Sequence, residues 1–237
     1  MKIKQNYFVL IALAGFSSMA LSEAVTGKII IDGQEYSSGS SNVIQGSGKT
    51  VTDKRKLNAF SKLSINIAAD IEYIASDSHR LELTADDNIA PTITSSIIGN
   101  TLSIDTNKSF STQSKIRTKI YGPSTLQSVV IDGSSDVNLQ GITGSSLEIN
   151  LDGTGDITAQ GKVSNLIISA NGSGNVNTKE LQADDVTINV EGSTDVTATA
   201  NKNLDVVING VSDVTYYGHP GSINKTIDGV GNVSAGD

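Results

Sequence analysis

The chain has 237 residues, with 25 acidic against 17 basic side chains, 37% apolar and 4% aromatic residues, and no cysteine. The negative charge argues against nucleic acid and anionic membrane surfaces as partners. The lack of cysteine excludes a disulfide framework and a lipid-anchoring thiol. The 23 glycines, mixed with Ser, Thr, Asn, Asp, Val and Ile, indicate many short strands joined by tight turns.

The first predicted element is a signal peptide over residues 1–24. Lys2 and Lys4 give it a positive start, and the apolar run YFVLIALAGF that follows is shorter than the ~20 residues of a membrane span. Small residues predict cleavage after Ala20 or Ala24. An uncleaved membrane anchor is the alternative. Cleavage after Ala20 leaves 15 basic against 25 acidic residues, a net charge of −10.

Residues 25–56 are predicted to be a flexible Ser/Gly-rich lead-in, with one short strand at 28–31. The sequence GSGKT at 46–50 resembles a phosphate-binding loop. However, Val43 stands where that motif needs its first glycine, and the following VTDKRKLNAF lacks an amphipathic helical pattern. We therefore interpret these glycines as residues required by the backbone conformation of the lead-in, and we expect no nucleotide binding.

A β-rich domain is predicted over residues 57–237. In its first part, 57–125, apolar and polar residues alternate without a regular repeat, as in the segments LSINI and TLSID. We expect irregular β-coils or a small sheet here. Such a segment would cap one end of a repetitive fold, because an open end exposes strand edges.

The second part, 126–237, contains six copies of one turn: IDGSSDV, LDGTGDI, ANGSGNV, VEGSTDV, INGVSDV and IDGVGNV. Successive copies are 18 to 20 residues apart. A constant period of this length is the signature of stacked repeats. We expect the first glycine of each turn to adopt a positive φ. These glycines are Gly133, Gly153, Gly172, Gly192, Gly210 and Gly229.

Before each turn, apolar and polar residues alternate, which indicates a strand with one buried face. A unit of about 19 residues cannot bury that face alone, whereas six stacked units form a continuous core. The sequence therefore predicts an all-β, right-handed parallel β-solenoid of about six coils, with no helix beyond the signal peptide. An antiparallel β-sandwich is the alternative. The predicted inward rows are Ile131, Leu151, Ala170, Val190, Ile208, Ile227 and Val137, Ile157, Val176, Val196, Val214, Val233.

Residues 60–237 resemble the head GIN domain family of auto-transporter-type adhesins. The resemblance rests on FSKLSINIAADIEY, IIGNTLSID, GPSTLQSVVIDGSSDV, the repeated glycine turns and VTYYGHPGSI. It implies an exported β-solenoid of a Gram-negative bacterium, in the periplasm, on the outer-membrane surface or secreted. The chain departs from the family pattern at Ser135, Thr194 and Ser212, which replace the second glycine of the turn.

A stacked row of polar turn residues is the first candidate site; we call it the Asx row. Its carboxylates would lie ~5 Å apart, so calcium could bridge them. The alternative, which we favour, is that they bond to nearby backbone N–H groups. The candidate calcium ligands are Asp136, Asp156, Asp195 and Asp213, and Asn175 and Asn232 interrupt their row.

Tyr216, Tyr217 and His219 form the second candidate site, just before Pro220. Exposed aromatic rings often stack on sugars, so these residues could bind a glycan. The alternative is that the tyrosines pack against the solenoid.

We therefore expect an exported, non-enzymatic surface or envelope protein that acts as an adhesin or binding scaffold. Its partner would be a glycan or a protein surface, and its strand edges could support self-association. The alternatives are a polysaccharide-active β-helix enzyme and a purely structural envelope component. An enzyme is disfavoured because no arginine follows Arg117, and neither His79 nor His219 lies in a catalytic spacing. We expect no catalytic residue and no cofactor, with calcium in the Asx row as the disfavoured alternative.

Overall fold

The structure, a computed structural model, describes residues 28–31, 34–37 and 43–237. The predicted signal peptide lies outside these residues. The chain divides into two compact units, Met1–Ser41 and Asn42–Asp237. In the first unit, β1 (Lys28–Ile31) and β2 (Gln34–Ser37) pair as an antiparallel hairpin.

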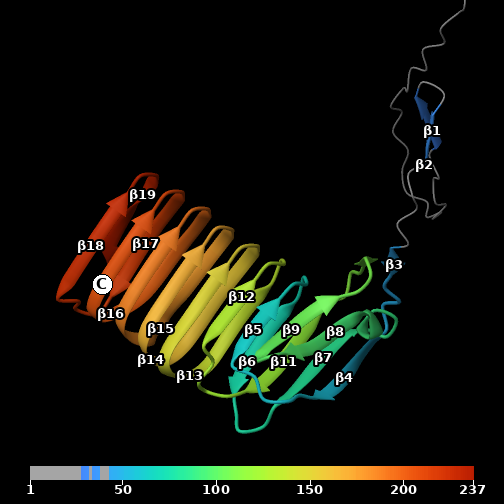
Figure 1. The fold of residues 1–237 in the computed structure, drawn as a ribbon, viewed down its shortest axis with the longest axis horizontal. Coiled ribbons are helices and arrows are strands. Elements are labelled where there is room, and N and C mark those ends of the chain that lie inside the picture. The colour runs from blue at the N-terminus through green and yellow to red at the C-terminus, as the bar shows by residue number, and fades with distance from the viewer. Residues whose placement is uncertain (1–27, 32–33, 38–42) are drawn as a thin grey trace, which may run out of the picture. The chain divides into compact units, whose positions relative to one another are not determined.

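The second unit is a parallel β-solenoid, shown in Figure 1. The regular strands are β13 (Asp136–Leu151), β14 (Thr154–Ala170), β15 (Ser173–Val190), β16 (Ser193–Ile208), β17 (Val211–Tyr217), β18 (Ser222–Ile227) and β19 (Val230–Ala235). The long strands β13 to β16 stack in chain order, each in parallel with the next, and β17 and β18 both pair in parallel with β16, as β19 does with β17. The predicted solenoid is therefore confirmed, and the sandwich alternative is wrong.

The N-terminal part of this unit also consists of strands, with one turn of 3-10 helix at η1 (Ala90–Thr92). None of the helices in the described residues is long and apolar enough to cross a membrane. The strands are β3 (Ile44–Gln45), β4 (Thr50–Lys56), β5 (Lys62–Ile65), β6 (Asp70–Ala75), β7 (Arg80–Asp86), β8 (Ile93–Ile98), β9 (Thr101–Thr106), β10 (Phe110–Ser111), β11 (Arg117–Gly122) and β12 (Ser128–Ile131).

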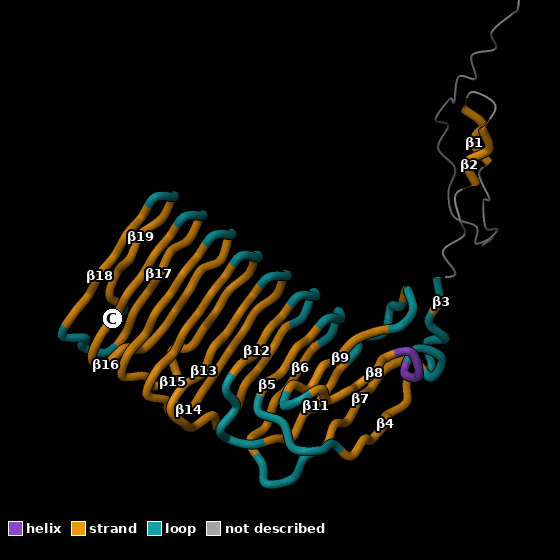
Figure 2. Tube along the Cα trace, in the orientation of Figure 1, coloured by secondary structure: helices purple, strands orange, loops and turns teal. Residues whose placement is uncertain are grey.

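Each coil contributes a strand to two faces. The β12 face contains β8, β9, β5, β12, the second halves of β13 to β16, and β18. The β6 face contains β4, β7, β11, β6, the first halves of β13 to β16, β17 and β19. The turns that join the two faces line up along one edge, drawn in teal in Figure 2.

The core lies between the two faces and is built from the predicted inward rows. Val137, Ile157 and Val176 pair in register, and none is more than 2% exposed. On the opposite face, Leu151 and Ala170 pair in the same way and are fully buried. Stacking identical inward positions thus gives the continuous core that a single repeat could not form.

The N-terminal strands do not stack in chain order. The coil formed by β5 and β6 lies between the coil of β9 and β11 and the coil of β12 and β13. Three antiparallel strands then cover this end: β8 on β9, β7 on β11, and β4 on β7. Residues 57–125 therefore provide two further coils and most of the cap.

Strand β4 falls within the segment that the sequence assigned to the lead-in. Its sequence, TVTDKRK, has no apolar row, so the pattern gives no sign of a strand. Pairing of its backbone with β7 places it in the main sheet, as the edge strand of the β6 face.

Candidate functional site

The first glycines of the turns form a column in which each backbone passes close to the next. A Cβ atom on Gly172 would collide with the carbonyl oxygen of Gly153, and one on Gly192 with that of Gly172. None of these first glycines has a positive φ, so the expected φ at these positions is wrong. Glycine is needed here because the coils approach more closely than a side chain allows.

The second turn position shows two solutions. Where it is glycine, as at Gly155 and Gly174, φ is positive, at 147° and 143°. Where it is Ser135 or Thr194, the side chain is buried and hydrogen bonds to the preceding coil. Ser135 Oγ donates to the Ile67 carbonyl at 2.7 Å. Where the chain departs from the family pattern, at Ser135 and Thr194, a buried hydroxyl group thus takes the place of a glycine with positive φ.

The Asx row is a hydrogen-bonded ladder. Asp136 Oδ1 accepts the backbone N–H of Asp156 at 3.1 Å, and Asp156 Oδ1 accepts that of Asn175 at 3.0 Å. Asp195 Oδ1 likewise accepts the N–H of Asp213 at 2.9 Å. One carboxylate oxygen in each of these pairs therefore joins two coils, which is the backbone role favoured from the sequence.

The same row includes Asp70, which the repeat pattern did not reveal. Asp70 pairs in register with Asp136, because residues 66–69 form a turn beneath that of Gly133. In the described residues, no group of three or more Asp, Glu, His or Cys side chains is arranged to hold a metal ion. The Asp70 carboxylate instead pairs with Lys115 at 3.7 Å and Arg117 at 3.8 Å.

Asp70, Arg117, Asp136 and Asp156 border an open groove of about 410 Å³ on the outer side of the β6 face. Four neighbouring strands contribute polar side chains to it. They are Arg117 and Lys119 from β11, Asp70 and Glu72 from β6, Asp136 and Asn138 from β13, and Asp156 and Thr158 from β14.

The basic side chains of the groove lie on β11, and the acidic ones lie on β6, β13 and β14. Lys119 Nζ lies 2.9 Å from Glu72 Oε2, and this carboxylate raises the pKa of Lys119. Asp136 and Asp156 use Oδ1 for backbone N–H groups, and their Oδ2 atoms make no hydrogen bond within the described part of the chain. The groove thus combines ion pairs with two carboxylate oxygens that can accept further hydrogen bonds.

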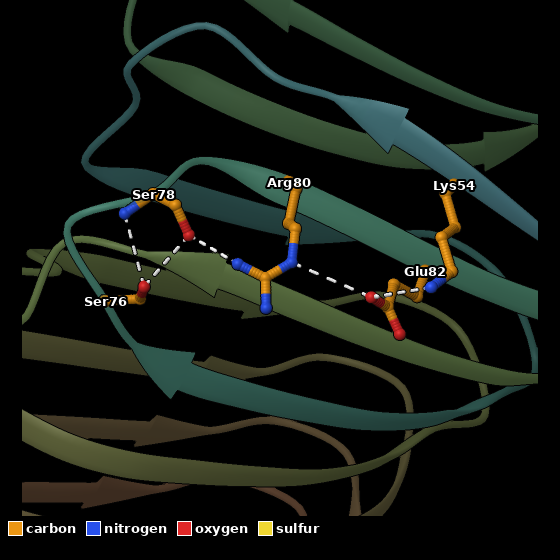
Figure 3. A network of polar contacts seen from close by, with 5 residues as sticks. All are labelled: Lys54, Ser76, Ser78, Arg80 and Glu82. Carbon is orange, nitrogen blue, oxygen red and sulfur yellow. Dashed lines mark hydrogen bonds and ion pairs between the residues drawn. The ribbon is translucent and has the colours of Figure 1, made fainter.

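A second polar network joins β4, β7 and the turn before β7, as Figure 3 shows, and β7 pairs with β11 at the border of the groove. Arg80 donates to Ser78 and lies 3.7 Å from Glu82, which also faces Lys54 at 3.6 Å. The Arg80 guanidinium stacks 3.4 Å from the ring centre of Tyr121. Lys54 and Arg80 are therefore paired with acidic or aromatic neighbours.

The candidate aromatic site does not form one flat surface. Tyr216 is half-buried and packs against the core, whereas Tyr217 points outward, with Lys179 Nζ 3.9 Å from its ring centre. His219 is exposed. Because neighbouring residues of a strand face opposite sides, Tyr217 lies outside the core, but it is itself half-buried, which leaves His219 as the exposed residue of the three.

The GSGKT segment is a connection between β3 and β4. Gly48 has a positive φ of 74°, and the Gly46 backbone lies too close to Asp86 for any side chain. Asp86 is 1% exposed and accepts a hydrogen bond from Thr112 Oγ1 at 2.8 Å. The hydroxyl groups of Ser114 and Thr112 hold the pKa of Asp86 below its ordinary value. These glycines therefore wrap a buried carboxylate.

Residues 59–220 match the family model described as "Putative auto-transporter adhesin, head GIN domain". The chain belongs to this head GIN domain family. The resemblance carried by the sequence motifs is thus confirmed, and none of the curated proteins compared matches this head GIN domain chain.

Solved structures share the head GIN domain fold. A "putative adhesin" from Bacteroides fragilis is 25% identical, with 81% of this chain and 99% of that chain covered and a TM-score of 0.67. A "putative adhesin" from Parabacteroides merdae is 18% identical, with 82% and 99% covered and a TM-score of 0.57. Another from Parabacteroides distasonis is 19% identical, with 82% and 100% covered and a TM-score of 0.55.

Proposed function

We propose that this protein is an exported, non-enzymatic binding scaffold of the cell envelope, and that its groove holds part of a surface glycan. The adhesin descriptions of its family and of similar structures support a role in attachment. The groove itself is the observation that carries the proposal, because it combines a rigid sheet with hydrogen-bonding groups from four strands.

Sugar hydroxyls fit the free groups of this groove. Carboxylate oxygens such as Asp136 Oδ2 and Asp156 Oδ2 accept hydrogen bonds, while Arg117 and Lys119 donate them. The side chains project from paired strands, so they are held in place before a ligand arrives, which lowers the entropic cost of binding. Tyr217 and His219 lie on the outer side of a later coil and would extend such a surface.

Substitution of one groove residue by a bulky side chain tests the proposal. Thr158→Trp would fill the groove, whereas Thr197→Trp places the same side chain in the same outward row, two coils further along. We expect a glycan found by array screening to bind the wild-type protein and Thr197→Trp with similar affinity. Its affinity for Thr158→Trp should be at least tenfold lower. Equal binding by both variants would place the ligand elsewhere.

A polysaccharide-active enzyme is the second candidate, because the structure joins groups that are far apart in the sequence. Strand β11 places Arg117 and Lys119 beside Asp70 and Glu72 of β6, and β13 and β14 follow with Asp136 and Asp156, so basic and acidic side chains share one groove. A reducing-sugar assay with Asp156→Asn, and with Asp195→Asn as control outside the groove, separates the two functions. Sugar release that is lost only in Asp156→Asn would replace the scaffold with an enzyme.

A purely structural envelope component would bind no ligand on either face. The location of the protein in the cell distinguishes this structural function from attachment. We expect the protein to be accessible to added protease on intact cells, and an exclusively periplasmic location would argue against attachment.

A further inference from the structure

The two ends of the solenoid differ in how their strand edges are covered. At the N-terminal end, antiparallel strands pack over the coils, and the edge strand β4 carries Lys54, Arg55 and Lys56. In the last described coil, β18 pairs only with β16, and β19 only with β17 (Figure 1). Their free N–H and C=O groups can pair with another strand.

Apolar side chains are also uncovered at this edge. Ile223 and Ile227 lie in register with Leu204 and Ile208, which are fully buried in the preceding coil. Ile223 is 37% and Ile227 40% exposed. Val230 stacks on Val211 in the adjoining turns, and both side chains are exposed. A further coil of the same shape would bury the two isoleucines, as the last coil buries Leu204 and Ile208, whereas the valine row stays exposed even where a coil covers it, as at Val211.

Lys225 interrupts this apolar end. It lies in register with Val206, which is 2% exposed, and the same row carries isoleucine in earlier coils, for example at Ile168 and Ile188. Lys225 Nζ donates to the backbone carbonyl of Val233 on the opposite face at 3.1 Å. Its aliphatic stem therefore crosses the end of the core, and its ammonium group reaches the other sheet.

We propose that Lys225 prevents a second copy of this chain from stacking on the open edge of the last coil. A second copy would complete the backbone pairing and cover the isoleucines. Stacking would also remove the Lys225 ammonium from water and leave it with a single hydrogen bond, which is strongly unfavourable. An inward-pointing charge of this kind protects an open sheet edge from association.

Two substitutions that remove the ammonium group test this inference. Lys225→Met keeps most of the aliphatic stem, and Lys225→Gln keeps a shorter polar side chain. Asn224→Met is the matched control, because Asn224 is the neighbouring, outward-facing residue of the same strand. Mass would be measured by size-exclusion chromatography with light scattering over a concentration series, and folding by circular dichroism.

We expect the wild-type protein and Asn224→Met to remain monomeric, and Lys225→Met to form dimers or larger species whose mass rises with concentration. Adding Ile223→Lys to Lys225→Met should restore the monomer, because it places a charge on the same edge. Folded but monomeric Lys225→Met and Lys225→Gln would overturn the proposal. It would also be overturned if both variants fail to fold, since Lys225 would then serve folding, or if wild type already associates through this edge and Ile223→Lys dissociates it.

Discussion

The carbonyl oxygen of Gly153 lies 1.9 Å from the place that a Cβ atom at position 172 would take, far too close for a real contact. The same relationship recurs from coil to coil, so the glycine column sets the closest approach between successive turns. Because the obstructing atom belongs to a backbone that is paired on both sides, it cannot move aside as a flexible side chain could.

Alanine in this column should therefore destabilise the solenoid. We expect Gly172→Ala to lower the free energy of unfolding by roughly 1–3 kcal/mol, as overpacking does. Gly221→Ala is the control, because the nearest atom to its added Cβ is 3.8 Å away. Urea unfolding would measure both variants. Equal midpoints for the two would show that the turns can separate without cost.

Asp86 should make the fold sensitive to acid. Its pKa is lowered in the folded state, so its contribution to stability is complete above its unfolded value of about 4. That contribution is lost as the pH falls through the folded value. We expect Asp86→Asn to melt below wild type at pH 7, and the difference to shrink toward pH 2. Melting curves across this range, with exposed Asp77→Asn as control, would check this; a constant difference at every pH would contradict it.

The Asx row predicts a contrast between asparagine and alanine. Asp195→Asn keeps an oxygen that can accept the N–H of Asp213, and Asn175 and Asn232 show that the row tolerates asparagine, so we expect near wild-type stability. Asp195→Ala loses this bond and should cost about 1 kcal/mol.

The melting temperature of the wild-type protein should also be unaffected by millimolar calcium or EDTA, because the row already bonds to the backbone. A clear rise in the melting temperature with calcium would instead support the calcium site formed by the carboxylates of this row.

The two adjacent tyrosines should behave differently. Tyr216 packs on the core, so Tyr216→Ala should lower stability by roughly 1–3 kcal/mol. Tyr217→Ala removes a contact with the Lys179 ammonium group outside the core and should cost only ~0.5–1 kcal/mol. Thermal melts of both variants give this comparison. If Tyr217→Ala proves the more destabilising, its contact with Gly236 and the C-terminal strand matters more than the cation–π geometry suggests.

The stacked half of the fold could be predicted because every coil repeats the same inward positions, such as Val137 and Val176. The role of the first glycine could not, since one repeat alone does not show that Gly153 lies beneath Gly172. A positive φ is a property of a single residue, whereas this close approach is a property of two coils.

The coil of β5 and β6 could not be predicted from the sequence for a different reason. Ile67 and Ala69 replace both turn glycines, and the neighbours of this coil are distant in the sequence. The groove was hidden with it, because the pairing of β11 with β6 is what places Arg117 beside Asp70. By contrast, the alternation in SINKTI already places Lys225 inward between Ile223 and Ile227.

The insertion of this first coil between two later ones constrains how the molecule can assemble. In the order of synthesis, residues 62–75 appear before either of their neighbours, so both edges of this coil remain open until residues 101–122 and 128–140 follow. The chain cannot wind up turn by turn from its beginning. We expect the repeats beyond residue 136 to form a template on which the earlier strands close last.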